Sequence, residues 1–141
     1  MERLTERAAA PRHDALAGKV IVVLEDDDLV RRATERVLRR FGAEVVAGRS
    51  SVEVLAALAG RDLAVSCVVA DFWLSREESG LAAVASLRAA AGARLSGARP
   101  GAVIVTGDLS RETAEAVAGA GFPLLRKPVD IDRFVAALLD G

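Results

Sequence analysis

The chain has 141 residues, of which 52% are hydrophobic, and a formal net charge of −1. These values predict one globular domain with a substantial core, and the near balance of charges argues against nucleic acid as a direct partner. A single cysteine excludes an internal disulfide, and a single histidine argues against catalytic triads and zinc sites built on histidine.

No apolar run approaches the roughly 20 residues of a membrane span, and the N-terminus lacks the apolar core of a signal peptide. We therefore expect a soluble cytoplasmic protein without a membrane partner. Residues 1–17, rich in Ala, Arg and Glu, are interpreted as a tail or linker, and residues 18–141 as the folded domain.

The first apolar run, Val20–Leu24, predicts a strand that is buried on both faces. The four-residue spacing of Leu29, Ala33, Val37 and Phe41 then predicts a helix from Asp28 to Phe41 with one apolar stripe. The further expected elements are a strand at 43–47, a helix at 50–59, a strand at 65–70, a helix at 79–91, a loop at 92–101, a strand at 102–106, a helix from 110 to 119–121, a strand at 122–125 and a helix from 130 to 140.

Strand and helix alternate five times, which predicts right-handed crossovers and a doubly wound parallel α/β sheet with helices on both faces. No Gly-x-Gly-x-x-Gly follows the first strand, and no Gly-x-x-x-x-Gly-Lys-Ser/Thr occurs. The phosphate cradles of dinucleotide-binding and P-loop proteins are therefore missing.

Polar residues follow four of the apolar runs: the cluster 25–28 (Glu-Asp-Asp-Asp), Asp71, Thr106 and Lys127. Because parallel strands that point the same way end at one edge of a sheet, we expect these residues to share a crevice. Carboxylates, a hydroxyl and an ammonium together suit a divalent cation and a phosphoryl group.

Asp71 and the acidic cluster also have a purely structural interpretation. Asp71 could act as a nucleophile toward phosphorus or simply open a turn. The acidic cluster could hold Mg²⁺ or cap the following helix, a task expected of Asp27 or Asp28. The bond between Lys127 and Pro128 is left open as cis or trans.

Four segments, in this order and spacing, resemble the receiver domain of bacterial two-component response regulators. The resemblance runs from about Gly18 to the C-terminus and rests on Val-Val-Leu-Glu-Asp-Asp-Asp-Leu-Val-Arg-Arg at 22–32, Val-Val-Ala-Asp-Phe-Trp-Leu at 68–74, Val-Ile-Val-Thr-Gly at 103–107 and Leu-Leu-Arg-Lys-Pro at 124–128. It implies a flavodoxin-like (CheY-like) fold with strand order 2-1-3-4-5.

The resemblance also implies roles for individual residues. Asp71 would accept a phosphoryl group from a histidine kinase or a histidine phosphotransfer protein. Asp26 and Asp71 would bind Mg²⁺ directly, Glu25 would bind it through water, and the backbone carbonyl of Trp73 would be the remaining protein ligand. Thr106 matches the switch hydroxyl of the family, and Lys127 matches its lysine.

The sequence departs from the family pattern near the site. Ser75 replaces a common proline, the stretch 75–79 is one residue longer than usual, and Leu124 replaces a common aromatic residue. A switch must therefore use other groups than that ring. Trp73 and Asp108 flank the expected approach of hydrolytic water, and we hypothesise that they set the lifetime of the aspartyl phosphate.

The output of the domain is less defined. The face at 110–139 is expected to serve partners or a homodimer, although Val117, Ile131, Phe134 and Val135 are interpreted as core. The chain resembles either a stand-alone regulator or the receiver of a hybrid kinase, with segments 107–108 and 121–125 closer to the second. No enzyme activity is expected, because a haloacid-dehalogenase-type phosphatase would need a second Asp where Trp73 stands. The alternative function is a receiver-like adaptor that is never phosphorylated.

Overall fold

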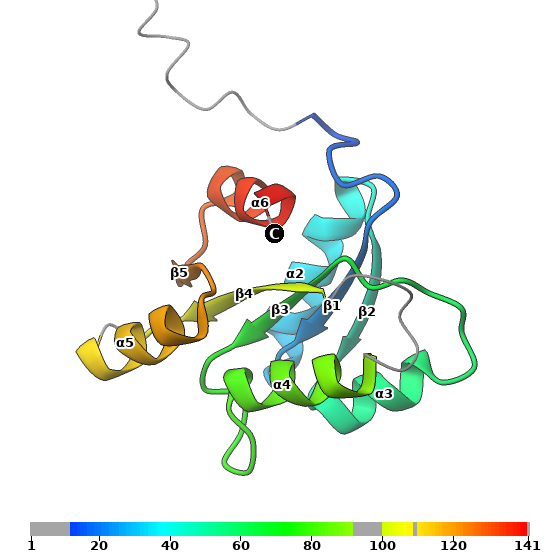
Figure 1. Ribbon diagram of the computed structural model, residues 1–141. Coiled ribbons are helices and arrows are strands. Elements are labelled where there is room, and N and C mark those ends of the chain that lie inside the picture. Colours follow the sequence, from blue (N-terminus) through cyan, green and yellow to red (C-terminus); the bar gives the residue numbers. More distant parts are fainter. Residues whose placement is uncertain (1–11, 92–99, 109, 141) are drawn as a thin grey trace, which may run out of the picture.

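The structure is a computed structural model that describes residues 12–91, 100–108 and 110–140. It contains β1 (Val20–Leu24), α2 (Asp28–Arg40), β2 (Glu44–Gly48), α3 (Ser51–Leu58), β3 (Cys67–Asp71), α4 (Gly80–Ala91), β4 (Gly101–Thr106), α5 (Arg111–Ala120), β5 (Leu124–Arg126) and α6 (Ile131–Asp140). All neighbouring strands pair in parallel, in the order β2-β1-β3-β4-β5 (Figure 1). The expected fold class and strand order are confirmed.

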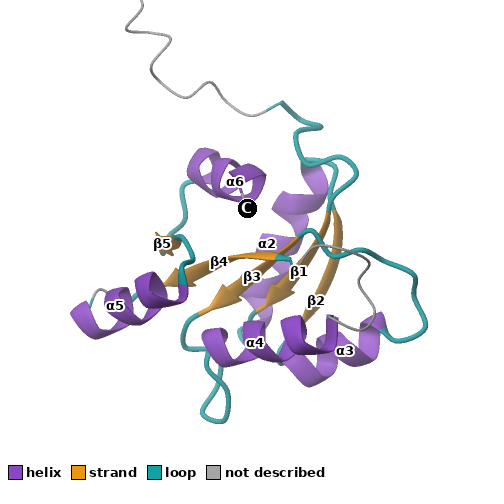
Figure 2. Ribbon diagram, viewed as in Figure 1, coloured by secondary structure: helices purple, strands orange, loops and turns teal. Residues whose placement is uncertain are grey.

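The sheet separates two apolar layers, and helices cover both of its faces (Figure 2). Along β1, Val22 and Leu24 pack with residues of α3, α4 and α5, while Ile21 and Val23 pack with residues of α2 and α6. Successive side chains of a strand point to opposite faces, so a strand covered on both sides must be apolar throughout. The continuous apolar run of β1 follows from its central place.

The apolar stripe expected on α2 is partly wrong. Leu38 is buried and Phe41 packs against the same core cluster, but Leu29 remains 78% exposed and Ala33 is exposed as well. A helix turns through 3.6 residues, so each four-residue step drifts by about 40° around the axis. Over three such steps the predicted stripe leaves the face that meets the sheet.

The interpretation of the α5 and α6 side chains as core holds for three of the four residues. Val117, Phe134 and Val135 are buried, whereas Ile131 at the start of α6 keeps 43% of its surface exposed. Ile131 lies in the first turn of its helix, beside the cavity between α2 and α6 that is described below.

Strand β5 begins two residues later than expected because the preceding residues complete α5. Gly121 adopts a left-handed conformation with φ of 82°, and the N–H of Phe122 donates to the carbonyl of Val117. This pairing closes the last turn of a helix and removes Phe122 from the strand.

Two further residues, Leu16 and Cys67, are buried in the core. Leu16, within the stretch expected to be a tail, is fully buried, and its N–H donates to the carbonyl of Phe41. Cys67 is buried in β3, and burial raises the pKa of its thiol to about 11, which keeps the thiol protonated and unreactive near neutral pH. Residues 1–11 of the expected tail and 92–99 of the expected loop lie outside the described residues.

Candidate functional site

The acidic residues meet at the carboxyl edge of β1 and β3. Leu24 of β1 pairs with Ala70 of β3, so the residues that follow them, Glu25 and Asp71, are neighbours. Carboxylate oxygens of Glu25, Asp26 and Asp71 all lie within 4.8 Å of one another. A set of converging carboxylate oxygens fits a hard divalent cation such as Mg²⁺, which prefers oxygen ligands.

The other two acids of the cluster have structural tasks. The Asp27 side chain accepts a hydrogen bond from the N–H of Val30 at 3.0 Å, which makes it the N-cap of α2. Asp28 pairs with Arg31 at 2.7 Å and with Arg49 at 3.3 Å. Of the two capping candidates, the structure therefore selects Asp27, and it leaves Glu25 and Asp26 beside Asp71.

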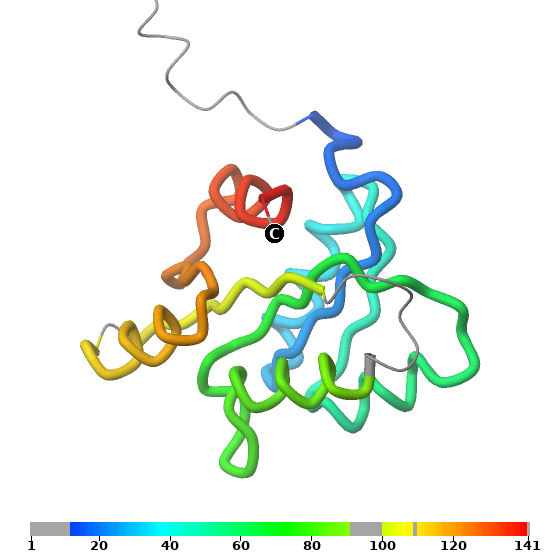
Figure 3. Tube along the Cα trace, in the orientation of Figure 1, coloured from blue at the N-terminus to red at the C-terminus, as the bar shows by residue number. Residues whose placement is uncertain are grey.

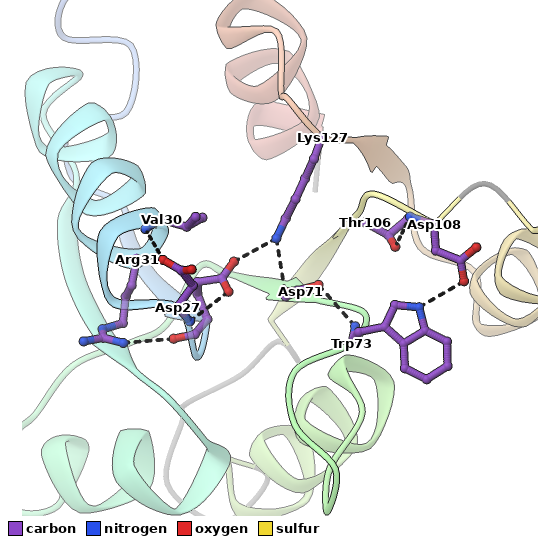
Figure 4. Close-up of polar contacts among 9 residues, drawn as sticks. Asp27, Val30, Arg31, Asp71, Trp73, Thr106, Asp108 and Lys127 are labelled. Carbon is purple, nitrogen blue, oxygen red and sulfur yellow. Dashed lines mark hydrogen bonds and ion pairs between the residues drawn. The ribbon is translucent and has the colours of Figure 1, made fainter.

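Lys127 reaches the acidic group from the opposite side of the crevice (Figure 4). Its Nζ donates to Oε1 of Glu25 and to Oδ2 of Asp71, both at 3.1 Å. The bond between Lys127 and Pro128 is cis. One ammonium thus serves two carboxylates whose side chains are only 7% and 11% exposed.

The protonation equilibria of the group follow from this crowding. Burial raises the pKa of Glu25, and the charge of Asp71 adds to this, against the N–H of Asp27 and the ammonium of Lys127, which lower it. Burial alone would lower the pKa of Lys127, but its hydrogen bonds to Asp71 and Glu25 outweigh this effect and raise it. The carboxylates of the site repel one another, and an added cation would reduce this repulsion.

Thr106 and Trp73 stand on the side of Asp71 that faces β4. The N–H of Trp73 donates to Oδ1 of Asp71 at 3.1 Å. Thr106, 1% exposed, accepts a hydrogen bond on its hydroxyl oxygen from the N–H of Asp108 at 2.9 Å, and within the described residues no hydrogen bond joins that hydroxyl to Asp71. The expected residues therefore gather around Asp71, but Thr106 is connected to it only indirectly.

Asp108 links the two loops that flank Asp71. Its carboxylate accepts hydrogen bonds from the indole Nε1–H of Trp73 at 3.0 Å and from the hydroxyl of Thr113 at 2.7 Å. The N–H of Ser110 contributes most to a lowered pKa of Asp108, about 2, followed by Thr113 and Trp73. Sequence reasoning placed Trp73 and Asp108 together but missed Thr113, whose only sequence signal is its place three residues after the helix cap Ser110.

The fold and the site together define a class of protein, and the comparisons agree with it. The sequence matches the response regulator receiver domain over residues 21–139. The chain therefore belongs to the family of response regulator receiver domains, which act as signalling switches in two-component systems.

Solved structures share this fold. A receiver domain protein from Clostridium thermocellum is 21% identical with a TM-score of 0.70, over 86% of this chain and 92% of that chain. A receiver protein from Pseudomonas putida is 24% identical with a TM-score of 0.69, over 95% and 99%. A CheY-like receiver domain from Methylobacillus flagellatus is 26% identical with a TM-score of 0.64, over 86% and 97%. No curated protein matches the chain significantly in sequence.

Within the described part of the chain, none of the helices combines the length and the apolar character that crossing a bilayer requires.

Proposed function

We propose that this protein is the phosphoacceptor switch of a two-component phosphorelay, with Asp71 as the residue that is phosphorylated. The observation that carries the proposal is the environment of Asp71. Its carboxylate lies at the edge of the sheet, beside Glu25 and Asp26, with one oxygen bound by Lys127 and the other by the N–H of Trp73.

The transfer would proceed by attack of an Asp71 oxygen on the phosphorus of a phosphohistidine. The P–O bond forms, the P–N bond breaks, and its electron pair leaves with the imidazole nitrogen of the donor. The N–H of Trp73 orients the carboxylate, and the ammonium of Lys127 turns from the carboxylates to the new phosphoryl oxygens. The hydroxyl of Thr106 already accepts from Asp108, so its proton is available to a phosphoryl oxygen.

A divalent cation belongs to this proposal because the donor set fits it. Glu25, Asp26 and Asp71 would hold Mg²⁺, with the backbone carbonyl of Trp73 as a further ligand and Glu25 acting through water. The ion would supply neutralisation of negative charge on the transferred group. Positioning by the residues above then supplies most of the remaining acceleration, as is usual for phosphoryl transfer.

A cavity beside Asp71 offers a route by which the donor would approach. A cavity of ≈ 560 Å³ lies between α2 and α6, and Asp71, Lys127 and Glu25 line its polar end. Its walls are apolar, and the exposed side chains Leu29 and Ile131 stand on the first turns of the two flanking helices. A histidine kinase or histidine phosphotransfer protein that brings its histidine to Asp71 by this route would cover this mouth.

The proposal is tested by intact-mass analysis after incubation with a small phosphodonor and Mg²⁺, for the wild type and for Asp71→Asn. A Mg²⁺-dependent gain of one phosphoryl group that is lost in Asp71→Asn supports it. If neither a small donor nor a phosphorylated histidine phosphotransfer protein modifies Asp71, the protein is the alternative, an adaptor that acts without phosphorylation. Turnover of a generic phosphate ester would instead indicate a phosphatase.

A further inference from the structure

The loop at 72–79, which connects β3 to α4, is fixed at its base to the phosphoacceptor strand. The N–H of Gly80 donates to the carbonyl of Phe72 at 2.8 Å. A Cβ at Gly80 would lie 2.3 Å from the carbonyl oxygen of Asp71, so only glycine allows this approach. The end of the loop therefore packs directly against the backbone of Asp71. Figure 3 traces the loop as the narrow excursion before α4.

The loop is also closed on itself. The N–H of Ser75 donates to the carbonyl of Glu78 at 3.0 Å, and the N–H of Glu78 donates to the hydroxyl of Ser75 at 3.0 Å. Leu74 is fully buried in the core, whereas Arg76 and Glu77 at the tip are exposed. These contacts fix the backbone of Glu78. Its side chain extends out of the loop toward α3.

The Glu78 carboxylate binds the first residue of a different helix. One of its oxygens accepts from the N–H of Ser51 at 3.0 Å, and the other accepts a short hydrogen bond from the Ser51 hydroxyl. Ser51 is buried and begins α3. The first N–H groups of a helix lack intrahelical partners and carry partial positive charge, which favours a carboxylate there.

This contact adds to the capping of α3, because it pairs an N–H group that Ser50 and Glu53 do not bind. Ser50 is already the N-cap and accepts from the N–H of Glu53, while the Glu53 carboxylate accepts from the N–H of Arg49. The bond between Glu78 and Ser51 therefore supplies a further cap for α3 and also joins α3 to a loop that lies 27 positions away in the sequence.

The turn before α3 also contacts the acidic cluster at 25–28. The carbonyl of Gly48 accepts from the N–H of Glu25 at 3.1 Å, and the side chain of Arg49 pairs with Asp28 at 3.3 Å. A continuous path thus runs from Glu25 through the turn at 48–51 to Glu78 and on to the base of the loop at Asp71.

We infer that Glu78 is a positioning residue that joins the loop after Asp71 to the turn at 48–51 through hydrogen bonds. In this way it sets the spacing between the carboxylates that would bind a divalent cation. The inference rests on the proposed function, because it concerns the cation of that site. Residues that orient metal ligands from outside commonly affect metal affinity by 10- to 100-fold. Since Glu78 acts through two loops, we expect an effect of about tenfold, at the lower end of that range.

The test is a Mg²⁺ titration followed by NMR through the single indole resonance of the chain, which belongs to Trp73. The variants are Glu78→Ala, Glu78→Gln and Ser51→Ala, and the matched control is Glu77→Ala, which removes the same charge from the exposed tip of the same loop. Thermal unfolding of the metal-free variants reports their stability separately. Glu78→Gln keeps an acceptor for the Ser51 N–H and should retain an intermediate affinity.

The expected result is a Mg²⁺ dissociation constant raised about tenfold in Glu78→Ala and by a smaller factor in Ser51→Ala, which keeps the backbone N–H that Glu78 binds. The variant that combines Glu78→Ala with Ser51→Ala should show no further rise above Glu78→Ala, and Glu77→Ala should leave the constant unchanged. Stability loss with an unchanged dissociation constant in Glu78→Gln and Ser51→Ala overturns the inference and leaves the proposed function intact. A wild type that binds no Mg²⁺ overturns the metal of the proposed function and this inference with it.

Discussion

The ammonium of Lys127 lies 3.1 Å from Oδ2 of Asp71, although 56 positions separate the two residues in the sequence. The same ammonium contacts Glu25, so one cation balances two carboxylates that are largely withdrawn from water. The resting site therefore depends on Lys127 for its charge balance, and a bound divalent cation would relieve that dependence.

Replacing Lys127 by methionine should destabilise the metal-free protein by about 1–3 kcal/mol. Removal of one partner from a fully buried ion pair typically lowers the free energy of unfolding by about 3–5 kcal/mol. The loss should be smaller here, because 30% of the Lys127 side chain is exposed. Urea unfolding measures the loss. Added Mg²⁺ should recover part of it, because the ion supplies positive charge between the same carboxylates.

The control for this variant is Arg126→Met, which removes a neighbouring positive charge that is exposed. Equal free energies of unfolding for Lys127→Met, Arg126→Met and the wild type would contradict the central place given to Lys127.

Asp108 should contribute acid-dependent stability. Hydrogen bonds from Ser110, Thr113 and Trp73 hold its pKa at about 2 in the folded protein, below its ordinary value of 3.8. A carboxyl with a depressed folded pKa stabilises the fold when ionised. Its contribution is therefore complete above about pH 4 and disappears as the pH falls to about 2.

The measurement is the free energy of unfolding of the wild type and of Asp108→Asn between these pH values. The difference between the two proteins should shrink as the pH falls, and a difference independent of pH would count against the assignment. Glu115→Gln, an exposed change on α5, is the control and should not alter the pH dependence of stability.

The sequence was sufficient for the architecture, and every predicted boundary of a described element falls within two residues of the observed one. The reason is physical: buried parallel strands need continuous apolar runs, and their ends must gather at one edge. Glu25, Asp71 and Lys127 could be brought together on this argument alone, because their position in the chain fixes their position on the sheet.

Contacts that depend on loop conformation could not be predicted in this way. Nothing in the spacing of Ser51 and Glu78 indicates that they bind, since the path of the loop between β3 and α4 decides it. The exposed position of Leu29 was missed for a different reason: its four-residue spacing to Ala33 fits a helix but not the particular face that meets the sheet.

The exposure of Leu29 leads to a prediction about the phosphodonor. Leu29→Asp should slow transfer from a phosphorylated histidine phosphotransfer protein about tenfold, corresponding to about 1.4 kcal/mol of binding energy. It should leave phosphorylation by a small phosphodonor unchanged, because Leu29 is 78% exposed and does not belong to the lining of the cavity that Asp71 and Lys127 share. Rapid-quench measurement of both reactions separates the two effects.

Leu139→Asp is the matched control for this variant. Leu139 is a half-exposed leucine at the far end of α6, away from the mouth between α2 and α6. If Leu29→Asp and Leu139→Asp slow transfer from the protein donor equally, the mouth is not the docking side.

The contact between Trp73 and Asp108 makes the hypothesis about phosphate lifetime specific. Trp73 is 60% exposed, its backbone N–H binds Asp71, and its indole is fixed by a hydrogen bond to the Asp108 carboxylate (Figure 4). A ring fixed there limits the approach of water to a phosphorylated Asp71, so Trp73→Ala combined with Asp108→Ala should hydrolyse the aspartyl phosphate about tenfold faster, a barrier change of about 1.4 kcal/mol.

Trp73→Phe keeps an aromatic ring but loses the N–H donor, so its rate should lie between those of the wild type and the double variant. Loss of phosphoprotein is followed by intact mass after removal of the donor. Equal rates in the wild type and the double variant would show that water reaches Asp71 by a route that these two side chains do not cover.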